Sequence, residues 1–161
     1  MEPPLYQSKW EALSRAYQRL SEFYEGKIDL LHSFQSPKDF VYSYFHSTYS
    51  LKESLKLLPG FDGKQGLVEV FIASAPGIAL GIDISNTEKH GVLSNPKSAS
   101  TIGSLNTHIH ILDPQGHDRT ELTLEVDGVR KDCLELANFN LALWKDFLRL
   151  HNLLPPPDLI V

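Results

Sequence analysis

Hydrophobic residues recur at intervals of three and four near the start of the chain, and this spacing predicts an amphipathic helix over residues 8–31. Gly26 is expected to weaken or end this helix, because glycine disfavours a helix interior. We interpret the apolar stripe as packing surface, and it comprises Trp10, Leu13, Tyr17, Leu20 and Tyr24.

A second helix is predicted to begin at Ser36 and Pro37 and to stop at Pro59 and Gly60. Serine caps a helix, proline suits the first turn, and Asp39 places a negative charge there. Its predicted core stripe is Val41, Tyr44, Phe45, Thr48, Leu51, Leu55 and Leu58. The opposite side carries a second face of polar aromatic residues, expected to meet a second copy of the chain or a ligand: Tyr42, His46, Tyr49 and Glu53.

Two periodicities compete over residues 65–91. Ile78, Leu80, Ile82 and Ile84 alternate as in a strand. Ala79, Asp83, Asn86 and His90 form a helical stripe instead. We favour a helix that is broken or kinked at Pro76-Gly77.

The pattern changes to a period of two after a turn-rich loop at 94–100. Residues 107–111 and 120–126 alternate and predict a hairpin, and the Asp127-Gly128 turn allows a third short strand over 129–133. A closing helix follows and is ended by three prolines at 155–157. Its predicted buried stripe is Leu134, Ala137, Leu141, Trp144 and Leu148.

These elements predict a mainly α fold: a four-helix bundle with a small antiparallel hairpin or meander inserted before the last helix. The 161 residues suit a single domain, 1–161, with the β insertion at about 100–133. A sheet this small is expected to lean on the helices.

Composition narrows the functional classes. Cys133 is the single cysteine, so no intrachain disulfide forms, and a reduced cytoplasm is the expected location. The N-terminus lacks a signal-peptide pattern, and the longest uncharged run, at 70–82, is shorter than the roughly 20 residues of a membrane helix. A net charge of −5 disfavours nonspecific attraction to nucleic acid, although a basic patch assembled at a dimer interface would escape this argument.

The polar run from Asp83 to His90 is the strongest candidate site. In a helix, Asp83, Asn86 and His90 share one face. Two interpretations stay open: capping and hydrogen bonds between helices, or contact with a ligand. The candidate ligand-binding residues are Asp83, Asn86, Lys89, His90 and His46, and the candidate catalytic residues are His90 and Lys89.

The order of elements, with Asn86, Lys89 and His90 late in the third helix, resembles the helical HEPN-like proteins of prokaryotes. Many of these are nucleases or components of defence and toxin–antitoxin systems. In the nuclease members an arginine precedes the motif histidine by four to six intervening residues, and two motifs meet across a homodimer. The corresponding positions here hold Asp83, Ile84 and Ser85.

This resemblance implies a homodimeric binding or interaction module, with a protein partner or RNA as its possible partner and no cofactor. The alternative is a metal-independent endoribonuclease that uses His90 as general acid or base, assisted by Lys89. A third hypothesis is a metal-dependent enzyme, because His108 and His110 fall on one face of their strand and could share a metal ion. Exposed strand histidines with no metal are the favoured interpretation of this pair.

Overall fold

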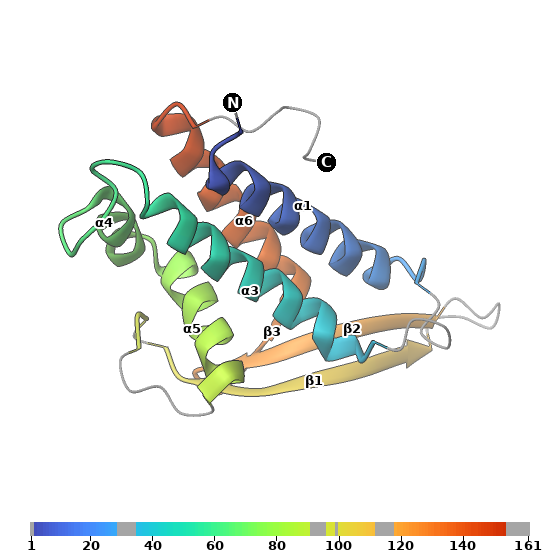
Figure 1. Ribbon diagram of the computed structural model, residues 1–161. Helices are drawn as coiled ribbons and strands as arrows, with labels where there is room; N and C mark the ends of the chain where they lie inside the picture. The colour runs from blue at the N-terminus through green and yellow to red at the C-terminus, as the bar shows by residue number, and fades with distance from the viewer. Residues whose placement is uncertain (1, 29–34, 91–95, 99, 112–117, 154–161) are drawn as a thin grey trace.

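The structure is a computed structural model that describes residues 2–28, 35–90, 96–98, 100–111 and 118–153, with the side chains of 90, 108–111 and 118–120 excepted. Helices gather on one face of a small sheet (Figure 1). The elements follow in the order α1 (Leu5–Tyr24), α3 (Pro37–Leu55), α4 (Leu67–Ser74), α5 (Pro76–His90), β1 (Ile102–Ile111), β2 (Asp118–Val126), β3 (Val129–Asp132) and α6 (Cys133–Leu150). The prediction of a mainly helical chain with its strands before the last helix is confirmed.

The first two long helices differ from their predicted bounds at the ends. α1 begins at Leu5 and ends at Tyr24, and Gly26 follows with a positive φ of 71°. The predicted stop at Gly26 is therefore confirmed, while residues 29–34 lie outside the described part of the chain. α3 begins as predicted, with the Ser36 side chain accepting from the Lys38 backbone N–H and Asp39 accepting from the Ser36 backbone N–H. It ends at Leu55, ahead of the predicted stop.

The break predicted at Pro76-Gly77 is confirmed, so the region contains two helices and the described residues form five in all. Ala75 is extended between them, at φ −123° and ψ 90°. Proline at the start of α5 cannot continue the α4 hydrogen-bond pattern. The two helices are bent by 100°, and no single helix in the described residues has the length and apolar character to cross a membrane, although this bent pair passes the same test.

The sheet is antiparallel, in the order β1-β2-β3. Leu105 pairs with Leu124, and β2 turns into β3 at Asp127 and Gly128, both at positive φ. This confirms the predicted third strand and its tight turn. The predicted turn at 113–116 lies outside the described residues. The buried face of the sheet, which supplies Leu105, Leu122, Leu124 and Val126 to the core, lies against the helices.

The Tyr24 hydroxyl ties α1 to the sheet and to α6. It donates to Asp132 Oδ1 at 2.7 Å and accepts from the backbone N–H groups of Leu122, at 3.1 Å, and Leu134, at 3.3 Å. Asp132 also caps α6 by accepting from the Glu135 N–H at 2.9 Å. Tyr24, expected only as packing surface, is therefore also a polar junction between three elements.

Cys133 is fully buried at the start of α6. Burial, reinforced by the nearby negative charges of Asp132 and Glu121, raises the pKa of the thiol well above its ordinary range. Because the thiolate is the reactive form, we expect native protein at pH 8 to react with a disulfide reagent about a hundredfold more slowly than protein unfolded in urea. Thiol release followed by absorbance measures this, and equal rates in the two states would contradict the burial.

Candidate functional site

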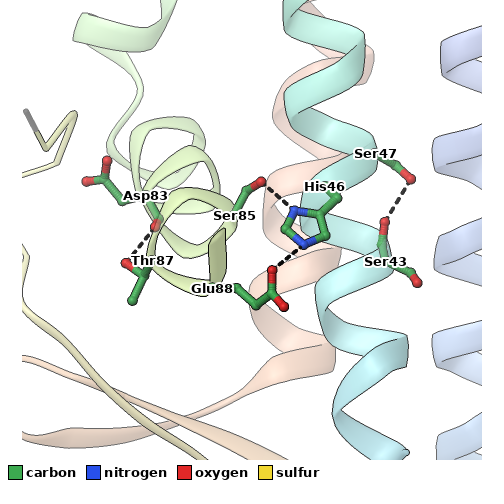
Figure 2. A network of polar contacts seen from close by, with 7 residues as sticks. All are labelled: Ser43, His46, Ser47, Asp83, Ser85, Thr87 and Glu88. Carbon is green, nitrogen blue, oxygen red and sulfur yellow. Dashed lines mark hydrogen bonds and ion pairs between the residues drawn. The ribbon is translucent and has the colours of Figure 1, made fainter. Parts of the chain in front are cut away.

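The structure does not bring the predicted site residues together on one surface. Asp83 and Ser85 project from opposite sides of α5, and Asp83 points away from α3 (Figure 2). Asp83 is fully buried, and its carboxylate accepts three hydrogen bonds: from Lys97 N at 2.7 Å, Ser98 N at 2.6 Å and Ser98 Oγ at 2.7 Å. Both oxygens are therefore occupied in holding residues 97 and 98 against α5. These contacts give Asp83 a structural role, and contact of the predicted cluster with a ligand stays a prediction.

Lys89, unlike Asp83, is not held by residues 97 and 98. Lys89 is exposed, and its ammonium lies 4.3 Å from the centre of the Tyr49 ring on α3. Asn86 is half-buried. The backbone of His90 ends α5, but its side chain lies outside what the structure describes. The spacing in the sequence placed these residues correctly on a helix, but Asp83 and Lys89 have different neighbours.

His46 joins α3 to α5. Its Nδ1 lies 2.6 Å from Ser85 Oγ and its Nε2 lies 2.9 Å from Glu88 Oε2 (Figure 2). The face that carries His46 and Tyr49 therefore packs on α5 of the same chain. Part of the face expected to meet a second copy therefore contacts α5 of the same chain, and the homodimer through this face stays a prediction.

Ser85, His46 and Glu88 are joined by hydrogen bonds, as are the serine, histidine and acid of a hydrolase triad. Their geometry, however, is not that of a triad. In such triads Nε2 faces the serine and Nδ1 faces the acid, which is the reverse of the arrangement at His46. Ser85 is also fully buried, so no substrate reaches its hydroxyl. The set acts as a polar joint between two helices.

The two histidines proposed as metal ligands are placed by backbone register alone. His108 pairs with Glu121 and His110 with Arg119, across β1 and β2. Among the residues whose side chains are described, no group of three or more His, Cys, Asp or Glu could hold a metal ion. The side chains of His108 and His110 lie outside that part, so the metal hypothesis stays a prediction.

A cleft of about 470 Å³ is lined by residues of α3, α4, α5 and α6 and by Lys97, Ser98 and Ser100. Its walls are apolar, and its polar groups come from the segment that Asp83 holds in place. The apolar walls include Phe45, Ile72, Leu80, Ile84, Leu136 and Phe139, and the polar residues are Lys97, Ser98 and Ser100. A volume of several hundred Å³ with a few polar groups is typical of small-molecule sites.

Two glycines on α5 line this cleft and allow α6 to approach closely. A Cβ at Gly81 would lie 2.6 Å from the Asn140 side-chain nitrogen, and one at Gly77 would lie 2.6 Å from the Phe139 ring. Asn140 donates to the Gly77 carbonyl at 3.1 Å and accepts from the Tyr44 hydroxyl at 2.9 Å. This buried set of hydrogen bonds fixes α5 against α6 behind the cleft.

Lys97 is the one charged residue among those that line the cleft. Its charge also acts on Glu69 of α4: burial raises the pKa of that carboxyl, but Lys56, and more weakly Lys97, bring the pKa below its ordinary value. Glu69 has its own ion pair with Lys56 at 2.9 Å. Within the described part of the chain, Lys97 forms no ion pair.

A second depression, of about 430 Å³, lies where α1 approaches α3 and contains the predicted site residue Lys89. Lys9 and Glu53 also line it, so its charges have both signs. Tyr49 also lines this depression. Two ammonium groups lie near the centre of its ring, that of Lys52 at 4.0 Å and that of Lys89 at 4.3 Å. Occupied in this way, the ring offers little surface for a ligand to stack on.

Comparison of the chain with protein-family models, with curated proteins and with solved structures found no match. The site is therefore argued from geometry alone. Sequence analysis missed Lys97 and Phe139 as cleft residues. A signal for the α6 wall was present, because Leu136, Phe139 and Leu143 repeat at three and four beside the main stripe of the last helix. Phe139 is 60% exposed despite its apolar ring.

Proposed function

We propose that this chain is a HEPN-like binding module, in which α1, α3, α5 and α6 correspond to the four helices of the bundle, and that it binds a small apolar ligand in the cleft. The observation that carries the proposal is the cleft itself, about 470 Å³ in volume and apolar on most sides. Asp83 supports the same proposal, because its buried carboxylate holds the polar wall in position. The polar cluster thus serves binding by building the site and not by touching the ligand.

Catalysis has less support among the described contacts. Asp83 occupies a position where the nuclease pattern requires arginine, and its oxygens already accept three hydrogen bonds. The Lys89 ammonium lies against the Tyr49 ring, in a depression that the acidic residue Glu53 also lines. A phosphodiester in the transition state needs cations and hydrogen-bond donors converging on its oxygens. The acidic balance of the chain also opposes a polyanion.

The neutral fluorescent probe N-phenyl-1-naphthylamine tests the binding function. We expect saturable fluorescence enhancement with the purified protein, because the probe emits strongly only when shielded from water. Ala73→Trp should weaken binding by tenfold or more, since Ala73 is an exposed cleft residue and an indole there occupies the space. Excitation at wavelengths that tryptophan does not absorb keeps the added indole from contributing to the signal.

Ala142→Trp is the matched control, because Ala142 is exposed on α6 and does not line the cleft. Equal weakening in both variants, or no saturable binding to the parent protein, would contradict the proposal. Incubation with labelled RNA addresses the alternative function. RNA cleavage that disappears in His90→Ala would overturn binding in favour of the nuclease.

A further inference from the structure

The described residues that line the cleft carry charge of one sign only. Among the residues that the structure describes, Lys97 is the single charged residue of the lining and no lining residue is acidic, while Glu69, whose pKa Lys97 helps to lower, is paired with Lys56. Asp83 is fully buried and does not line the cleft, and its carboxylate accepts three hydrogen bonds from Lys97 and Ser98. A cationic ligand would meet the Lys97 ammonium with no carboxylate to pair with, whereas an anion would gain a partner.

The hydroxyl groups of the two serines that line the cleft, Ser98 and Ser100, are not equivalent. The Ser98 hydroxyl donates its proton to Asp83 and has none left for a ligand oxygen. Ser100 also lines the cleft, and its hydroxyl forms no hydrogen bond with any described residue. Lys97 and Ser100 are therefore the two side chains with donors available to a bound anion.

The number of donors limits the charge of that anion. A phosphate group carries close to two charges and three acceptor oxygens, and sites for it usually supply several converging donors or an arginine fork. One lysine and one hydroxyl suit a single negative charge with two oxygens. The remaining walls, with Phe45, Phe139 and Leu80 among them, suit an apolar body.

We propose, resting on the binding function above, that the ligand class is a small apolar monocarboxylate. Its carboxylate accepts from Lys97 Nζ and Ser100 Oγ at the mouth of the cleft. Its aliphatic or aromatic body lies against α5, between α4 and α6. Asp83 is a positioning residue in this arrangement, since it holds the backbone of Lys97 and does not contact the ligand.

A pair of compounds that differ only in the charged group tests the assignment: 4-phenylbutyrate and 4-phenyl-1-butanol. Isothermal titration calorimetry with the full chain should show the acid binding five- to tenfold more tightly than the alcohol. Lys97→Gln should reduce this preference to less than twofold, because it weakens binding of the acid more than binding of the alcohol. Lys97→Arg should retain it, because the charge remains. High salt should narrow it, since the ammonium is at the surface.

Lys38→Gln is the matched control, because Lys38 is an exposed lysine in the first turn of α3, at the end of that helix remote from α4 (Figure 1). It should leave the preference intact. Equal affinities for the acid and the alcohol, or a preference that survives Lys97→Gln, would overturn the carboxylate assignment and leave the binding function standing. If the protein binds the naphthylamine but not 4-phenylbutyrate, the carboxylate assignment would be overturned as well. Failure of all three compounds would end both proposals.

Discussion

Replacement of Asp83 by alanine is expected to lower the free energy of unfolding by about 3 kcal/mol. The substitution removes an acceptor for three hydrogen bonds and leaves the Lys97 and Ser98 backbone N–H groups without their partner. It also leaves a cavity at a fully buried position. Urea unfolding followed by circular dichroism measures the change. A loss below about 1 kcal/mol would mean that water satisfies these groups.

The same variant separates stability from binding. Asp146 on α6 is exposed, so Asp146→Ala should change stability by less than about 0.5 kcal/mol and serves as the control for loss of a carboxylate. Because Asp83 holds the polar wall of the cleft, Asp83→Ala should also weaken binding of the naphthylamine probe at temperatures where the variant is still folded. Unchanged binding in a destabilised variant would show that the cleft does not depend on this anchor.

Replacement of Tyr24 by phenylalanine is expected to cost about 2 kcal/mol. The hydroxyl connects α1, β2 and α6 by donating to Asp132 and accepting from two backbone N–H groups. Phenylalanine preserves the ring but leaves those partly buried donors without an acceptor. Tyr42→Phe is the control, since the Tyr42 hydroxyl forms no hydrogen bond with the described residues, and it should change stability by less than about 0.5 kcal/mol. Equal losses in the two variants would contradict the role of Tyr24.

The free energy of unfolding should depend on pH differently in the parent chain and in Tyr24→Phe. Burial, and then the hydrogen bond to Asp132, raise the pKa of the Tyr24 phenol well above its ordinary value. An acid whose folded pKa exceeds its unfolded pKa stabilises the protein below the unfolded value and loses that contribution as the pH rises above about 10. Unfolding free energies between pH 8 and 11 should therefore fall less steeply for Tyr24→Phe than for the parent chain.

The elements of the fold were largely readable from the sequence because local chemistry specifies them. Ser36 and Asp39 satisfy the first N–H groups of α3, Pro76 cannot continue a helix, and Asp127-Gly128 adopts the positive φ angles of a tight turn. Each of these signals acts within a few residues, so no tertiary contact is needed to interpret it. The predicted ends of α1 and α3 were less accurate, since fraying and packing decide where the last turn of a helix lies.

The site depended on contacts between residues far apart in sequence. Helical spacing placed Asp83 and Lys89 on one helix, but only the tertiary structure decided that Asp83 faces residues 97 and 98 and that Lys89 faces Tyr49. His46 meets Ser85 across two helices for the same reason. The sequence by itself determined which residues are helical or extended and which faces are apolar. Which faces meet, and where they leave a cleft, was decided by packing, because a polar side chain is structural or accessible only in relation to what lies against it.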